Sequence, residues 1–285
     1  MTTIAIIGIG LIGGSMAKDL KSQLNVQVLG VDTNPENAAL ATKMELVDKM
    51  VSYAQAVQQA QVIILAFPVH LIEKQLPQIL NDIPEGTVVI DVGSTKEEIC
   101  SSVADHPKRG QYVAAHPLAG TEYSGPSAAL SGLFRNKNNI ICDKEKSDEQ
   151  ALKLALSLFS SLGMKTIFLD SHAHDKHLAY VSHLSHISSF TLSLTVLDIE
   201  KDESQIFNLA STGFQSTARL AKSSPDTWSP ILEKNSQHLI EAIDKYNSYL
   251  MAFRTALIEK DKTKLKELMS SANDIKRVLN NKQIL

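Results

Sequence analysis

His116 is the residue of this sequence whose chemistry is simplest to state. It follows an apolar run at 112–115 and opens the segment His-Pro-Leu-Ala-Gly-Thr-Glu, which closes with Glu122. An imidazole with an ordinary pKa of about 6.5 can accept a proton from a hydroxyl group near neutral pH. Oxidation of an alcohol needs such a base beside the hydride acceptor. An ordinary loop histidine is the alternative, and the position after an apolar run favours the base.

The start of the chain has the spacing of a dinucleotide-binding turn. The hexapeptide Gly-Ile-Gly-Leu-Ile-Gly follows the apolar run 3–7 and opens a helical pattern. In such a turn Gly8 permits a sharp bend, Gly10 lets the backbone approach a pyrophosphate, and Gly13 lets the helix pack closely on the strand. The free N–H groups of the helix then face the phosphates. A glycine-rich turn without a ligand is the alternative, which this context disfavours.

An acidic residue selects between the two nicotinamide dinucleotides. Asp32 ends the next apolar run, at 26–31. Its carboxylate can accept hydrogen bonds from the adenosine ribose hydroxyls and would repel a 2′-phosphate, so we expect NAD rather than NADP. The expected cofactor site comprises Gly8, Gly10, Leu11, Ile12, Gly13, Asp32 and Ser94.

Ser94 lies in the segment Asp-Val-Gly-Ser-Thr-Lys, just past the apolar run 87–91. Ligands bind outside the carboxyl ends of parallel strands, which would place Ser94 near the nicotinamide. The alternative is that Ser94 or Thr95 caps a following helix, with Glu97 or Glu98 near its N-terminus. The residues taken alone favour the cap.

The stretch 172–186 is dense in histidine. His183 and His186 are three residues apart and would share one face of a helix. A metal site is an alternative, but no Cys, Asp or Glu completes an obvious ligand set. We therefore expect polar side chains that line a cleft, and no metal. The histidines are His172, His174, His177, His183 and His186.

Arg219 ends the segment Thr-Gly-Phe-Gln-Ser-Thr-Ala-Arg and precedes Trp228. Its guanidinium offers two parallel donors that match a carboxylate. A solvated helix arginine is an equally simple interpretation.

Alternating strands and helices must position these residues. Short apolar runs recur through the first 169 residues with helical stretches between them, which predicts a mostly parallel, doubly wound sheet of the Rossmann type with helices on both faces. Pro35 is expected near the start of a helix. The predicted strands are 3–7, 26–31, 62–66, 87–91, 112–115, 139–142 and 166–169.

The pattern changes near residue 170, after which we predict only helices, at 171–199, 229–259 and about 262–280. Apolar residues recur every third or fourth position from Leu232 to Leu257, broken only by Ser236. Such a seam is typical of a helix packed along its length against another helix. We expect two domains, an NAD-binding domain at 1–169 and a helical domain at 170–285.

Composition excludes several classes of protein. The sum of 28 basic and 31 acidic residues gives a net charge of −3, without the basic surface that nucleic-acid binding needs. The N-terminus has no basic segment typical of a signal peptide, and no apolar run is as long as a membrane span. Two cysteines, Cys100 and Cys142, are expected to be thiols in a reducing compartment, so we expect a cytoplasmic protein.

Taken together, the motifs resemble the prephenate/arogenate dehydrogenase family over nearly the whole chain. The resemblance implies an N-terminal Rossmann domain and a helical C-terminal domain that forms a homodimer. It also implies NAD-dependent oxidative decarboxylation of prephenate to 4-hydroxyphenylpyruvate in tyrosine biosynthesis. The matching segments are GIGLIGGS at 8–15, DVGSTK at 91–96, HPLAGTE at 116–122, HD at 174–175, SHLSH at 182–186 and TGFQSTAR at 212–219, with Trp228.

The same resemblance implies roles for individual residues. His116 corresponds to the catalytic histidine, and Ser94 to the serine that orients it and the nicotinamide. Arg219 corresponds to the arginine that holds a substrate carboxylate. The remaining substrate-pocket residues that it implies are Glu122, His183, His186 and Trp228.

Two positions depart from the family pattern, in which proline is usual at Ser185 and aspartate is common at Ser216. The second change removes a possible charge partner of Arg219. We expect a monofunctional enzyme. Arogenate is the alternative substrate, and a silent NAD-binding regulator is a remote alternative. A β-hydroxy-acid or imine dehydrogenase would usually rely on a lysine in the helical domain, where only Lys201 stands out between 182 and 219.

Overall fold

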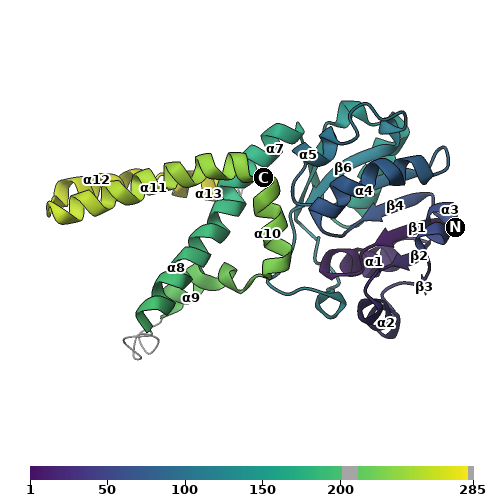
Figure 1. The fold of residues 1–285 in the computed structure, drawn as a ribbon, viewed down its shortest axis with the longest axis horizontal. Coiled ribbons are helices and arrows are strands. Elements are labelled where there is room, and N and C mark those ends of the chain that lie inside the picture. The colour runs from purple at the N-terminus through teal and green to yellow at the C-terminus, as the bar shows by residue number, and fades with distance from the viewer. Residues whose placement is uncertain (201–210, 282–285) are drawn as a thin grey trace. The chain divides into compact units, whose positions relative to one another are not determined.

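The computed structural model describes residues 1–200 and 211–281. The chain divides into two compact units, Met1–Ser236 and Gln237–Leu285. The first unit holds the sheet and the helices around it, and the second is built from helices (Figure 1). None of the helices described is long and apolar enough to cross a membrane.

The first unit is built on one eight-stranded sheet, in the order β3-β2-β1-β4-β5-β6-β7-β8. Neighbouring strands are parallel except β6 and β7, which are antiparallel. The mostly parallel sheet expected from the sequence is confirmed. Because β1, β4, β5 and β6 are parallel neighbours, the loops that follow them meet at one edge. The strands are β1 Thr2–Ile7, β2 Val26–Val31, β3 Lys49–Met50, β4 Val62–Leu65, β5 Val88–Asp91, β6 Tyr112–Pro117, β7 Asn138–Cys142 and β8 Lys165–Leu169.

Helices cover both faces of this sheet. Along β1, Ile4 and Ile6 belong to one buried cluster, whereas Ala5 belongs to the other. Successive side chains of a strand point to opposite faces, so a continuous apolar run marks a strand buried on both. Helices α1 and α6 pack in the first cluster, and α3 and α4 in the second. The helices up to residue 161 are α1 Leu11–Gln23, α2 Pro35–Lys43, α3 Tyr53–Gln59, α4 Val69–Asp82, α5 Glu97–Ser101 and α6 Glu149–Ser161.

Local capping explains where helix α2 begins. Pro35 occupies the first turn of α2, and the Asn34 side chain accepts hydrogen bonds from the N–H groups of Glu36 and Asn37. Proline suits this position because its missing N–H would have no partner within the helix.

The helix predicted at 171–199 is present, but with an internal change of register. Helix α7 covers Ser171–Leu178 and α8 covers Leu184–Glu200. Between them Ala179–His183 form a π-helical turn, in which the Leu184 N–H donates to the Ala179 carbonyl. Such turns are rare and occur frequently at functional sites.

The prediction of one helix at 229–259 is wrong, because the helix ends at Asn235. Helix α10 covers Pro225–Lys234, and α11 covers Ser236–Ile258. The Asn235 side chain is buried and donates to the Asp175 carbonyl oxygen at 2.7 Å and to His183 Nδ1 at 3.0 Å. These tertiary contacts hold Asn235 outside helical geometry, with φ −110° and ψ 25°.

The last predicted helix is also interrupted. Helix α12 covers Lys262–Ala272 and α13 covers Ile275–Asn281, separated by Asn273 and Asp274. Both residue types are weak helix formers because their short side chains compete for backbone groups. Helix α9, Thr212–Ala218, completes the set of α-helices in the described ranges.

Candidate active site

The glycine turn after β1 is shaped as its spacing predicts. Gly8 has φ +93°, and a Cβ there would lie 2.5 Å from the Ala66 carbonyl oxygen. A Cβ on Gly13 would collide with the Gly8 carbonyl oxygen, so α1 packs directly on the turn. A Cβ on Gly10, in contrast, would meet no atom within 4 Å. Gly10 therefore leaves open space where a ligand can approach the backbone.

The N-terminus of α1 is free to bind an anion. Gly10 caps this helix without a side-chain hydrogen bond, and the first turn contains no acidic residue. Asp32, at the end of β2, accepts hydrogen bonds from the N–H groups of Ile9 and Asn34, each at 2.9 Å. Its carboxylate is thereby held beside the glycine turn. This arrangement fits a dinucleotide, with phosphates at the helix N-terminus and a ribose at the carboxylate.

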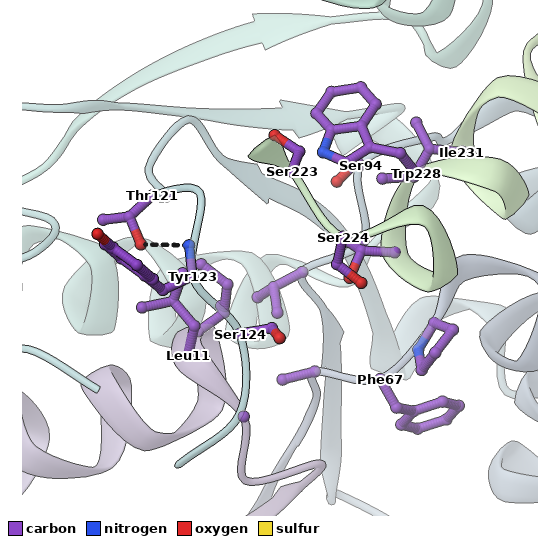
Figure 2. A pocket seen from close by; sticks show the side chains of 18 of the residues that line it. Leu11, Phe67, Ser94, Thr121, Tyr123, Ser124, Ser223, Ser224, Trp228 and Ile231 are labelled. Carbon is purple, nitrogen blue, oxygen red and sulfur yellow. Dashed lines mark hydrogen bonds between the residues drawn. The ribbon is translucent and has the colours of Figure 1, made fainter. Parts of the chain in front are cut away.

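A pocket of about 320 Å³ opens at this edge of the sheet. Figure 2 shows Leu11, Tyr123, Ser94 and Trp228 around it, contributed by segments far apart in the sequence. The lining residues named in the sequence analysis are Gly10, Leu11, Ile12, Ser94, Glu122 and Trp228.

A buried charged cluster fixes the position of the segment that carries Ser94. Asp91 pairs with the Lys96 ammonium group, and it accepts hydrogen bonds from Tyr112 Oη at 2.5 Å and from the Gly93 N–H at 2.8 Å. Burial and the nearby Asp91 raise the pKa of Tyr112 well above its usual value, so its hydroxyl keeps the proton that it donates. These contacts fix the loop between Asp91 and Lys96 and leave Ser94 at the pocket.

Neither Ser94 nor Thr95 caps the helix that follows them, contrary to the alternative interpretation. Helix α5 begins at Glu97 without a cap from its own preceding side chains. Instead, the carboxylate of Asp175 on α7 accepts the N–H groups of Lys96 and Glu97.

His116 is the last residue but one of β6 and lies at the same sheet edge. Its side chain is buried, and Nδ1 lies 2.9 Å from His174 Nε2. Burial, followed by the nearby His174, Lys96 and His183, lowers the pKa of His116 well below 6.5. The imidazole is therefore neutral at physiological pH and can accept a proton. In the described residues, 1–200 and 211–281, no hydrogen bond joins Ser94 to His116.

Two further histidines pack against Trp228, which lines the pocket. The rings of His186 and Trp228 are stacked, with centroids 3.3 Å apart, and His183 meets the indole edge-on at 5.9 Å. His186 Nδ1 lies 3.1 Å from the Ser182 carbonyl oxygen, which can only accept, so Nε2 of the neutral ring remains an acceptor. Burial lowers the pKa of both rings, that of His183 to about 4.

Arg219 is half exposed and faces Glu122. One guanidinium nitrogen lies 3.8 Å from Glu122 Oε2. Ser216, where the family often has aspartate, donates from Oγ to the Gly213 carbonyl oxygen at 3.0 Å. Arg219 therefore has a charge partner despite this departure. Lys201, which bore on the lysine-dependent alternative, lies outside the described residues.

Sequence reasoning missed two buried residues of this region. It expected His174, with the other histidines of the stretch, to line a cleft, and it gave Asp175 no role. The structure joins His174 Nδ1 to Asp175 Oδ1 at 2.6 Å and places this pair behind His116. Adjacent His and Asp on a predicted helix are a weak signal, because the partner that they reach lies 58 residues away.

Comparisons with known proteins agree along the chain. Residues 16–168 match the family described as prephenate dehydrogenase, nucleotide-binding domain, and residues 170–271 match prephenate dehydrogenase, dimerization domain. Prephenate dehydrogenase of Lactococcus lactis subsp. cremoris is 30% identical over 284 residues, which cover 98% of this chain and 78% of that protein.

Solved structures give the same result. Prephenate dehydrogenase from Aquifex aeolicus, in complex with hydroxyphenyl propionate and NAD⁺, has a TM-score of 0.86 and 27% identity, with 98% of each chain covered. Synechocystis arogenate dehydrogenase has a TM-score of 0.79 and 26% identity, and the match covers 98% of this chain and 100% of that one. The chain thus belongs to the prephenate dehydrogenase family of NAD-dependent oxidoreductases.

Proposed function

We propose that this protein catalyses the NAD-dependent oxidative decarboxylation of prephenate to 4-hydroxyphenylpyruvate, in the biosynthesis of tyrosine. The observation that carries the proposal is the neutral, buried His116 at the sheet edge where the glycine turn and Ser94 open into one pocket. The names of the relatives support the substrate, and the ligand of the Aquifex structure has the hydroxyphenyl ring of the proposed product.

The cofactor is held by the residues of the glycine turn. Gly10 and the first N–H groups of α1, from Leu11 and Ile12, would bind the pyrophosphate. Asp32 would accept the adenosine ribose hydroxyls, and Ser94 would lie at the nicotinamide end. When bound, NAD⁺ supplies the hydride acceptor. Gly8 and Gly13 act indirectly, because they let the turn and the helix adopt this shape.

His116 acts on the substrate hydroxyl. Its unprotonated ring nitrogen takes the hydroxyl proton as the ring carbon gives up hydride, and the carboxyl group on the ring then leaves as CO₂. The ring becomes aromatic, and the proton on His116 returns to the phenolic oxygen. A positioned base of this kind contributes about 10²–10⁴-fold to the rate.

A second group of residues would hold the substrate side chain and ring. Arg219 would bind the pyruvyl carboxylate through two parallel hydrogen bonds. His183, His186 and Trp228 would form the wall against the ring, and Glu122 would hold Arg219 until the substrate arrives. In this proposal, none of these residues binds a metal.

We also propose that the protein forms a homodimer through its C-terminal helices. The second matching family is described as a dimerization domain. Helix α11 exposes large apolar side chains, which a monomer would leave in water: Ile240, Tyr246, Tyr249, Leu250, Met251, Leu257 and Ile258. Exposed apolar patches of this kind mark interaction surfaces.

The functional division that we propose lies after Leu169, where the last strand ends. Residues 1–169 would bind the cofactor, and 170–285 would bind substrate and the second subunit. The compact units divide later, at Ser236, because α7 and α10 pack on helices of the sheet unit. The buried free thiols Cys100 and Cys142 support a reducing, cytoplasmic location.

Formation of NADH tests the proposal when the purified protein is given prephenate or arogenate, each with NAD⁺ or NADP⁺. Turnover of prephenate with NAD⁺ supports it as stated. Turnover of arogenate alone would keep the chemistry and replace the substrate. No turnover with either would overturn it in favour of a silent NAD-binding protein.

A further inference from the structure

Behind His116 lies a chain of two more buried polar side chains. His116 Nδ1 is 2.9 Å from His174 Nε2, and His174 Nδ1 is 2.6 Å from Asp175 Oδ1. The exposed fractions of His174 and Asp175 are 0% and 1%, so water does not compete for these contacts. Hydrogen bonds in such surroundings are strong, and an unmade one is costly.

The direction of each hydrogen bond follows from the groups that can only donate. Backbone N–H groups of Lys96 and Glu97 donate to the Asp175 carboxylate at 2.8 and 2.9 Å. Both carboxylate oxygens are therefore acceptors, and Oδ1 accepts the Nδ1–H of His174.

The tautomer of His116 follows from the same logic. The neutral His174 ring, with its proton on Nδ1, presents Nε2 as an acceptor. His174 Nε2 therefore accepts the Nδ1–H of His116. The lone pair of His116 is left on Nε2, which is the nitrogen free to meet a substrate.

We infer that His174 and Asp175 are positioning residues, which hold His116 in the Nδ1–H tautomer so that Nε2 is the base. This inference rests on the function proposed above. When Nε2 takes the substrate proton, the Nδ1–H of His116 stays donated to His174, and the carboxylate of Asp175 balances the new positive charge. The logic is that of an aspartate that orients a catalytic histidine, with one more imidazole between them.

The same carboxylate couples the base to the loop that carries Ser94. Asp175 holds the first N–H groups of α5, directly after the segment Asp91–Lys96. A second contact fixes the position of Asp175 itself, because Asn235 Nδ2 donates to its backbone oxygen at 2.7 Å. The base and one wall of the pocket are therefore aligned by one residue of α7.

The tautomer can be read directly in the wild-type protein from the nitrogen-15 chemical shifts of the His116 ring. We expect the proton on Nδ1 and a pyridine-type Nε2. This readout does not need turnover, so it tests the inference even if the proposed substrate is wrong. A proton on Nε2 in the wild-type protein would overturn the inference.

Asp175→Asn tests the effect on catalysis. An amide can donate to His174 Nδ1, which would reverse both hydrogen bonds and move the His116 proton to Nε2. We expect kcat for prephenate to fall about 10²–10⁴-fold with KM little changed. His174→Gln, which breaks the link to Asp175 and leaves the α5 contacts in place, should lower kcat in the same way if Asp175→Asn fails to fold. Lys176 is exposed on the same helix, so Lys176→Gln is the control and should keep the wild-type kcat.

The outcomes separate the inference from the proposed function. Wild-type kcat in a folded Asp175→Asn or His174→Gln protein would overturn the positioning role while the dehydrogenase activity stands. A wild-type protein that has the expected tautomer but turns over neither substrate would leave the positioning role of His174 and Asp175 intact and overturn the proposed function.

Discussion

The indole of Trp228 lies flat on the imidazole of His186, with ring centroids 3.3 Å apart and an angle of 24° between the planes. The two residues come from α10 and α8, so this stack joins two segments of the helical region, and Trp228 also lines the pocket.

Loss of the stack should weaken substrate binding more than catalysis. Aromatic pairs contribute about 0.5–1.5 kcal/mol beyond their buried area, so Trp228→Leu should lower kcat/KM for prephenate by roughly 2- to 13-fold. The loss should appear in KM, because neither ring carries the reacting atoms in the proposal. Trp228→Phe, which keeps an aromatic face, should lose less. An unchanged KM in Trp228→Leu would contradict a role for this stack in binding.

Arg219 offers a sharper test of how the substrate carboxylate is held. Hydrogen bonds to charged groups contribute about 1.5–3 kcal/mol, so Arg219→Ala should raise KM for prephenate by roughly 10- to 160-fold. Arg219→Lys keeps the charge but not the two parallel donors, and an intermediate KM is expected. KM for NAD⁺ should stay the same in both variants. A solvated arginine without a ligand would leave both KM values unchanged.

Asp32 should set the preference between the two dinucleotides. Asp32→Asn keeps an oxygen that can accept the Ile9 N–H but removes the negative charge. The ratio of kcat/KM with NAD⁺ to that with NADP⁺ should fall by roughly 10- to 100-fold, since a charge-assisted hydrogen bond is lost and a repulsion is relieved. A ratio equal to that of the wild type would show that another residue excludes the 2′-phosphate.

Buried neutral histidines should make stability fall in mild acid. Burial lowers the pKa of His183 from 6.5 to about 4 in the folded chain. Between these values the unfolded chain binds a proton that the folded chain does not. The neutral His183 therefore contributes fully to the free energy of unfolding above pH 6.5. This contribution, roughly 3 kcal/mol, is lost progressively as the pH falls toward 4.

His183→Asn tests this assignment. The Asn side chain can still accept from Asn235 at the position of Nδ1, but it does not titrate. Denaturant midpoints measured between pH 7 and pH 4 should therefore depend less on pH in the variant than in the wild type. Equal slopes would mean that other groups dominate the acid response, His116 among them, since its pKa is lowered in the same direction.

The sheet and the cofactor turn were predictable because their signals are local. Gly8, Gly13 and Asp32 lie within one strand–helix–strand unit, where spacing along the chain determines spacing in the fold. The helical region was less predictable. Asn235 ends a helix within the predicted apolar seam through contacts with Asp175 and His183, which lie 60 and 52 residues away. Helix propensity is too weak a signal to reveal such a break.

The residues of the candidate site were likewise predictable only where their signals are local. His116 could be identified because it follows a predicted strand, and strand ends meet at one edge of a parallel sheet. The partner of its second ring nitrogen could not, because His174 reaches it only when α7 packs behind β6. The buried Asp91–Lys96 pair was equally hidden, since its residues appeared only as the ends of a motif.

The most direct test of the account is the kinetics of His116→Asn. The Asn side chain keeps a polar atom near the position of Nδ1, which can still meet His174, and it removes Nε2, the proposed base. With prephenate and NAD⁺, kcat should fall about 10²–10⁴-fold with KM little changed. His70→Asn, exposed on α4, is the matched control and should behave as the wild type. A His116→Asn enzyme with near-normal kcat would contradict the central claim that this buried, neutral histidine takes the substrate proton.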